Sequence, residues 1–222
     1  MRREMGKGNS NLEQVAAPGS GISLGFVAAV AALIYTATLL TPAVSRGEVI
    51  ASASAGAPVQ SKTESKPVRF PGHGVTLAGT LLLPSPATNV PRTAKRPAVL
   101  FVSEEGTSNR DGYTVGKATH RIYLELAEGL AAEGIPSLRF DRRCQGESEC
   151  RQPQSFDDLI DDMYAALQFL GTQPGIDASR LVIVGHGEGG YLGICVLSQK
   201  EKAAAALVLI NTSGRVLGRM MR

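Results

Sequence analysis

A short glycine-rich segment has the spacing of a catalytic strand-to-helix turn. Its sequence is Gly185-His186-Gly187-Glu188-Gly189. In the Gly-x-Ser-x-Gly pattern of acyl-transfer enzymes, such a turn lifts a serine hydroxyl clear of the sheet, and the flanking glycines let strand and helix approach each other. Glycine stands at the serine position here. The scaffold favours catalysis, but Gly187 does not, because it has no side chain to attack a carbonyl carbon.

Apolar patterns around this turn predict strands that alternate with helices. Strands are expected over residues 75–83, 98–103, 135–141, 181–184 and 205–210. Helices are expected between His120 and Glu133, after a capping-box pattern at Ser155, and from Tyr191 to Lys200. The first of these should bury Ile122, Leu124, Leu126, Ala127, Leu130 and Ala131. Alternation of this kind predicts an α/β fold, a mostly parallel sheet with helices on both faces.

Four sequence blocks on these elements resemble the α/β-hydrolase superfamily. They are residues 70–84, 101–112, 139–148 and 182–190, in the order that the superfamily has them. Within it the chain is similar to exported bacterial carboxylesterase-like proteins, whose turn is Gly-His-Ser-Glu-Gly-Gly. The resemblance covers Val68 to the last residue. It implies an α/β-hydrolase fold, cleavage of small esters or peptides through an acyl-serine intermediate, and no cofactor.

The departures from this family fall on the chemistry. The nucleophile position is Gly187, and loss of a serine nucleophile lowers turnover on the order of a million-fold in a well-studied protease. The oxyanion hole would use the backbone N–H of Glu188 and one from the loop that holds Glu104 and Glu105. Carboxylates in that loop would oppose a developing oxyanion if they point toward it. Glycine also relaxes a strained turn, so Gly187→Ser is predicted to lower stability.

The remaining triad members are also missing from their expected places. In this fold the acid and the histidine follow later strands, and the chain stops at Arg222 before such loops. His73, His120 and His186 precede or lie within the turn and are interpreted as turn, helix-surface or packing residues. We therefore expect a domain that is incomplete at its C-terminal end and a hydrolase that is catalytically impaired.

Other residues with potential chemistry receive structural interpretations. Five aspartates are interpreted as turn and helix-start carboxylates: Asp141, Asp157, Asp158, Asp161 and Asp162. Cys144 replaces the glycine that the family usually has after its Asp-Arg-Arg turn. Cys144 and Cys150 are close enough for a disulfide, although two free thiols fit the spacing equally well. Cys195 is expected to be a small buried apolar residue, and no Cys/His spacing suggests a metal site.

The N-terminal part predicts export. The chain divides into an N-terminal segment (1–21), a signal peptide or membrane anchor (22–45), a flexible linker (46–67) and a partial hydrolase domain (68–222). Basic residues before the apolar run leave the N-terminus in the cytoplasm and send the rest outward. The domain would be periplasmic or extracellular, or held at the membrane if the segment is uncleaved.

Two other functions remain open from the sequence. A binding module could keep the fold and use the vacated pocket for a small ester or acyl ligand. The spacing Gly185-x-Gly187-x-x-Gly190 also matches a dinucleotide- or phosphate-binding turn. That alternative is weaker because Asn211, not an acid, follows the next strand. A net charge of +3, scattered along the chain, does not favour a nucleic-acid partner.

Overall fold

The computed structural model describes residues 15–16, 63–84, 95–106, 109–112 and 121–212 of the 222-residue chain. Seven strands form one sheet in the order β1-β7-β6-β4-β5-β3-β2. They are β1 (Val15–Ala16), β2 (Glu64–Pro71), β3 (Thr76–Leu83), β4 (Arg96–Val102), β5 (Ser137–Phe140), β6 (Ile176–His186) and β7 (Ala206–Ile210). The helices are α2 (Ile122–Ala132), α3 (Phe156–Gly171) and α4 (Glu188–Gln199).

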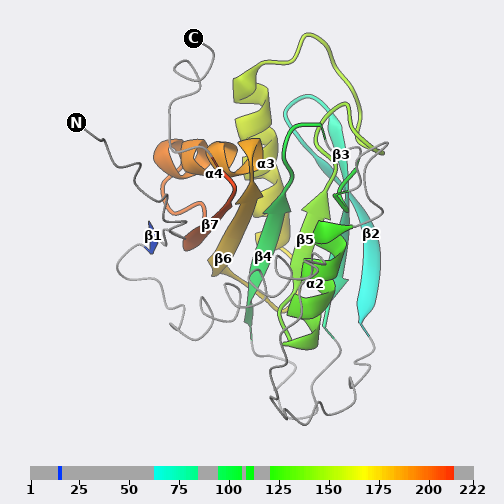
Figure 1. Ribbon diagram of the computed structural model, residues 1–222, viewed down its shortest axis with the longest axis vertical. Helices are drawn as coiled ribbons and strands as arrows, with labels where there is room; N and C mark the ends of the chain where they lie inside the picture. Colours follow the sequence, from blue (N-terminus) through cyan, green and yellow to red (C-terminus); the bar gives the residue numbers. More distant parts are fainter. Residues whose placement is uncertain (1–14, 17–62, 85–94, 107–108, 113–120, 213–222) are drawn as a thin grey trace, which may run out of the picture.

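The sheet is mostly parallel, as the sequence predicts. β5, β4, β6 and β7 run parallel to one another, whereas β3 is antiparallel to both β2 and β5, and β1 is antiparallel to β7. The carboxyl ends of the parallel strands therefore meet at one edge of the sheet, which is where ligands bind in open α/β sheets. In Figure 1 this edge lies at the arrowheads of β4, β5 and β6.

Helices cover both faces of the sheet, which confirms the predicted layers. Leu100 and Val102 of β4 belong to the core cluster that contains the buried residues of α3 and α4. Val99 and Phe101 point the other way, into the cluster that contains the buried residues of α2. Because both faces are covered, these strands are continuous apolar runs rather than alternating ones. Figure 1 shows α2 on one side of the sheet and α3 and α4 on the other.

Some element boundaries differ from the sequence prediction. β2 begins at Glu64, inside the segment 46–67 interpreted as a linker, and pairs with β3 from Glu64–Leu83 to Pro71–Thr76. Backbone pairing at a sheet edge requires no apolar side chains, so residues 64–67 are exposed and carry no apolar signal. Pro67 is tolerated because an edge strand leaves one side of its backbone unpaired. In addition, α4 begins at Glu188 rather than Tyr191, and β6 begins at Ile176 rather than Leu181.

The N-terminal prediction is not addressed by these elements. Residues 22–45, the predicted signal peptide or membrane anchor, lie outside the described residues. Among the helices that the structure describes, none is long and apolar enough to cross a membrane.

Candidate functional site

The strand-to-helix turn has an unusual backbone conformation at Gly187. Gly187 lies between β6 and α4 with φ 54° and ψ −119°. This combination lies outside the regions that L-residues populate without strain, and glycine adopts it because it has no Cβ. The Gly187 N–H donates to the Ile210 carbonyl at the end of β7 at 2.9 Å. The turn is therefore fixed by the neighbouring strand and does not depend on a side chain at position 187.

The flanking glycines allow the close approach that the sequence pattern implies. A Cβ added at Gly185 would lie 2.5 Å from the Gly190 Cα, and one at Gly189 would lie 2.3 Å from the Val102 carbonyl oxygen. Real Cβ atoms do not reach such distances from backbone atoms. These positions accept only glycine unless the strand and the helix move apart.

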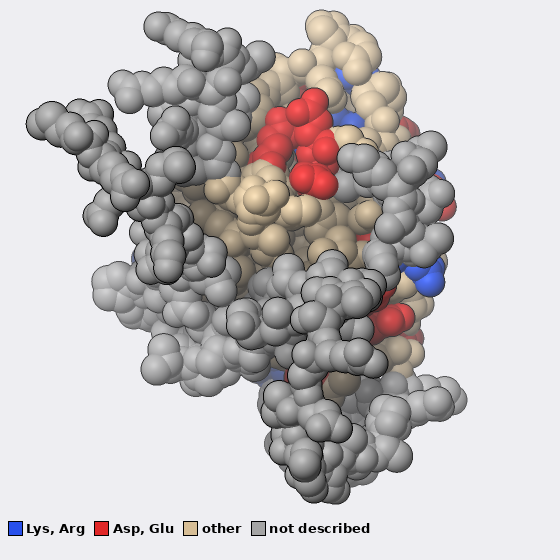
Figure 2. Space-filling model, in the orientation of Figure 1, with Lys and Arg blue, Asp and Glu red and all other residues tan. Residues whose placement is uncertain are grey.

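Glu104 packs against the position where the nucleophile would stand. A Cβ added at Gly187 would lie 3.0 Å from the Glu104 Cβ and 3.3 Å from its Oε2. The Glu104 Oε2 is also 3.9 Å from the His186 Nε2. The space that a serine hydroxyl would need is therefore bordered by a carboxylate. Figure 2 shows acidic side chains gathered over the ends of β4 and β6 on this face.

Tyr123 of α2 connects Glu104 with His186. The Glu104 N–H donates to the Tyr123 hydroxyl at 3.3 Å, and the hydroxyl is hydrogen-bonded to the His186 Nδ1 at 2.9 Å. Tyr123 is 2% exposed. Burial, partly offset by the hydrogen bond from the Glu104 backbone, raises the pKa of Tyr123 to about 12. The phenol thus stays protonated and holds the loop after β4 beside the turn.

These contacts change the expected oxyanion hole. Glu104 is near the turn as predicted, but its N–H already donates to Tyr123 and is not a free donor for an oxyanion. Glu105 is exposed in the turn that follows. Glu188 begins α4, and its carboxylate pairs with the buried Arg142 at 2.7 Å. Of the donors expected from the loop, the Glu104 N–H is therefore already engaged by Tyr123.

The loop after β5 is the other polar centre at this edge. Asp141 is 1% exposed and accepts hydrogen bonds from the backbone N–H groups of Arg110 and Glu147 at 2.6 and 2.9 Å. Asp141 therefore lies in a turn, as the sequence interpretation has it. Its carboxylate is buried, however, and joins two loop segments by hydrogen bonds. Cys144 and Cys150 form a disulfide across the same loop.

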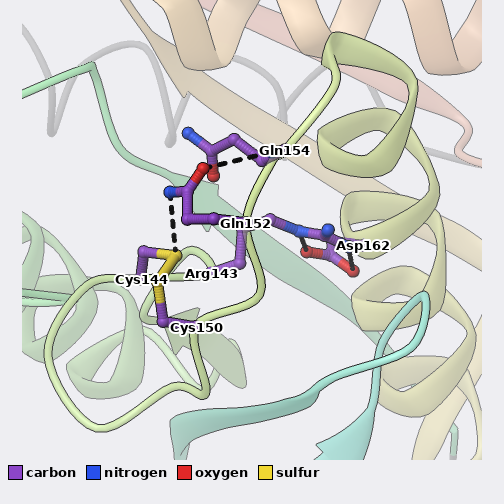
Figure 3. The surroundings of a disulfide bond; sticks show 6 residues. All are labelled: Arg143, Cys144, Cys150, Gln152, Gln154 and Asp162. Carbon is purple, nitrogen blue, oxygen red and sulfur yellow. Dashed lines mark hydrogen bonds and ion pairs between the residues drawn. A yellow bond between two sulfur atoms is a disulfide. The ribbon is translucent and has the colours of Figure 1, made fainter.

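Asp162 differs from the helix-start interpretation. It is 2% exposed in the second turn of α3, and its carboxylate accepts from the Arg143 Nε and Nη2 at 2.6 and 2.9 Å (Figure 3). The hydrogen bonds with Asp162 raise the pKa of Arg143. The ion pair fastens the disulfide loop to α3. Asp158, by contrast, does form the predicted capping box with Ser155.

The two histidines that the structure describes, His73 and His186, do not meet at one site. The His73 Nδ1 is 2.9 Å from the Asp158 Oδ1 on the far side of the disulfide loop. His186 lies at the strand-to-helix turn, and His120 lies outside the described residues. A cavity of about 320 Å³ lies beside the loop, lined by His73, Gly74, Arg143, Arg151, Pro153 and Asp158. No group of three or more metal-ligating side chains occurs within the described ranges.

Sequence reasoning missed three residues of this region: Tyr123, Arg142 and Arg143. Tyr123 lies three and four residues before Leu126 and Ala127, so helical spacing alone places it on the buried face. The two arginines gave no comparable signal, because their partners lie 46 and 19 positions away in the sequence.

Comparison with known proteins agrees with the fold and the turn. Residues 116–220 match the family model of serine aminopeptidases, S33. The hypothetical protein PA2218 from Pseudomonas aeruginosa is 25% identical with a TM-score of 0.55, and the match covers 70% of this chain and 45% of that one. The α/β-hydrolase GrgF from Penicillium sp. sh18 is 18% identical with a TM-score of 0.54, covering 67% and 46%.

The chain spans just under half the length of these two solved structures. No curated protein matches it. The order of the strands, the glycine-rich turn after β6 and the family match over residues 116–220 lead to the same assignment. The described part of the chain has the α/β-hydrolase fold, and residues 116–220 match a family model of that superfamily.

Proposed function

We propose that this chain keeps the scaffold of an ester- or peptide-cleaving hydrolase but does not carry out acyl-serine chemistry at its strand-to-helix turn. The observation that carries the proposal is the state of position 187. Its backbone has the conformation that presents a nucleophile, yet the residue is glycine. The carboxylate of Glu104 borders the same space. Position 187 therefore has no oxygen to attack a carbonyl carbon, and the negative charge of Glu104 would oppose an oxyanion that develops beside it.

The ligand class follows from the family rather than from the pocket. A small ester or acyl compound is the ligand we propose, as in the carboxylesterase-like group that the sequence resembles. A second candidate is binding of such a ligand without turnover. It is favoured by the buried Arg142, whose Nε and Nη1 have no hydrogen-bond partner in the described part of the chain. Buried donors of this kind are rare and commonly mark a site for a polar group.

The phosphate-binding alternative has less support. The carboxylate of Glu104, which lies beside the N-terminus of α4, would repel a phosphate there. Export stays a proposal as well. The Cys144–Cys150 disulfide supports it, since disulfides persist in oxidising compartments, and cell fractionation tests it.

A burst assay tests the proposed loss of chemistry. The full chain is mixed with p-nitrophenyl acetate, and nitrophenol release is followed alongside the protein's mass. We expect no burst and no acetylated protein for the wild type, and the same result for Gly187→Ala, a matched control that cannot form an acyl-serine. A burst with an acetyl group that peptide mapping places on residues 185–189 of the wild-type chain would overturn the proposal.

The same preparation separates the two candidates. Calorimetric titration with a non-hydrolysable ketone analogue of the ester reports binding independently of turnover. Saturable binding without a burst supports a binding role. If neither binding nor a burst is observed, the chain keeps a hydrolase scaffold but does not bind this ligand.

A further inference from the structure

The two sulfur atoms of the Cys144–Cys150 disulfide have unequal surroundings (Figure 3). Cys150 is exposed, whereas Cys144 is partly buried. Thiol–disulfide exchange begins with attack by a thiolate on one sulfur, so access decides which sulfur is attacked. The exposure of Cys150 favours attack at that residue.

Cys144 has the features of the leaving group. The Gln152 Nε2 donates to the Cys144 Sγ at 3.6 Å. The Gln152 Oε1 accepts from the backbone N–H of Gln154 at 3.2 Å, which orients the amide so that its NH₂ group faces the sulfur (Figure 3). A donor on a sulfur stabilises its thiolate, and a sulfur whose thiolate is stabilised leaves faster.

We propose that this disulfide is a modification site for thiol–disulfide exchange with a dithiol, attacked at Cys150 with Cys144 as the leaving group. The first thiolate of the dithiol forms a bond to the Cys150 sulfur, the Cys144–Cys150 bond breaks, and its electron pair stays on Cys144, which takes up a proton. The second thiolate then attacks the mixed disulfide and releases Cys150. Two electrons pass from the dithiol to the protein, which leaves two cysteine thiols and one oxidised dithiol.

The state of this bond is transmitted through the loop that contains it. Cys144 has φ 62°, a left-handed value that non-glycine residues rarely adopt. The preceding residues Arg142 and Arg143 pair with Glu188 at the strand-to-helix turn and with Asp162 of α3. Reduction removes the covalent link that helps to hold Cys144 in this conformation. The loop, with its two arginines, is the segment that loosens.

Direction of attack is tested with the full chain and reduced glutathione. Thiols freed by the reaction are trapped with iodoacetamide, and the peptides are mapped by mass spectrometry. We expect glutathione on Cys150 and the alkyl group on Cys144. The reverse distribution, or an equal mixture of both, would overturn the assignment of the leaving group.

The role of Gln152 is tested by the rate of reduction with dithiothreitol. Gln152→Ala removes the donor that stabilises the departing Cys144 thiolate, and we expect reduction to slow about threefold. Gln154→Ala is the matched control, because the backbone N–H of Gln154 remains. Both glutamines are exposed, so folding should survive either change. Equal rates for Gln152→Ala and Gln154→Ala would exclude Gln152 from the reaction.

Discussion

Two turns at the same edge of the sheet reach positive φ in different ways. Gly187 follows β6 with φ 54°, and Cys144 follows β5 with φ 62°. Gly187 has no Cβ, and its own N–H is held by the backbone of β7, through the Ile210 carbonyl. Cys144 keeps its Cβ and is held by a disulfide and by the bond from its N–H to the Glu149 carbonyl at 3.1 Å. The first turn is stable without a side chain, whereas the second depends on one.

The two turns also differ in whether side chains or backbone groups connect them to the rest of the domain. The disulfide loop is fastened by side chains, through the Arg143 pair with Asp162 and the hydrogen bonds to Asp141. The strand-to-helix turn is fastened mostly by backbone contacts with β4 and β7, and its side-chain network reaches it from α2. Substitutions in the two turns should therefore separate backbone strain from side-chain anchoring.

The largest effect is expected in the disulfide loop. Cys144→Ser/Cys150→Ser removes the cross-link and leaves a non-glycine residue with positive φ, so we expect a loss of about 2–4 kcal/mol in the free energy of unfolding. Cys144→Gly/Cys150→Ser also lacks the cross-link but relieves the left-handed strain. It should recover about 1 kcal/mol of that loss. Chemical denaturation of both variants beside the oxidised wild type measures the two contributions.

The Cys144→Gly/Cys150→Ser variant tests whether the backbone at Cys144 is strained. If Cys144→Gly/Cys150→Ser is no more stable than the double serine variant, the backbone of Cys144 is not strained. The two turns would then differ in more than their means of reaching positive φ.

A smaller effect is expected at the strand-to-helix turn. Gly187→Ser should destabilise the chain by about 1–2 kcal/mol, because a Cβ is strained at this φ and meets the Glu104 side chain. Gly175→Ser is the matched control, since Gly175 has φ 78° and open space around an added Cβ. The difference between their denaturation midpoints isolates the contact with Glu104. An unchanged or raised midpoint for Gly187→Ser would contradict the strain account.

The sequence predicts the turn better than the loop for a physical reason. The apolar run before Gly187 and the glycine spacing after it are local, so β6 and α4 could be located from neighbouring residues. The pairs Arg142–Glu188 and Arg143–Asp162 join separate elements, and no local pattern encodes them. The start of β2 at Glu64 was missed because an edge strand is defined by its backbone partners. Tyr123 was missed despite a local signal, because the predicted face included the partly exposed Ile122 and Leu124.

The smallest effect concerns the link from α2 to the strand-to-helix turn and appears as a pH dependence. The pKa of Tyr123 is raised to about 12 in the folded chain, above the ordinary tyrosine value of about 10. Between these values the unfolded chain has released the phenol proton and the folded chain retains it, so stability falls as pH rises. From pH 10 to 11 the loss should be about 1 kcal/mol.

Tyr123→Phe separates this titration from every other alkaline effect. The variant loses the hydrogen bonds to Glu104 and His186, which lowers its stability at all pH values, but it has no phenol to ionise. Its stability should therefore decline less steeply above pH 10 than that of the wild type, by the same amount of about 1 kcal/mol. Parallel declines in urea denaturation at pH 10 and 11 would mean that Tyr123 ionises as readily in the folded chain as in the unfolded one. The turn would then lack its buried side-chain support and would rest on its backbone contacts alone.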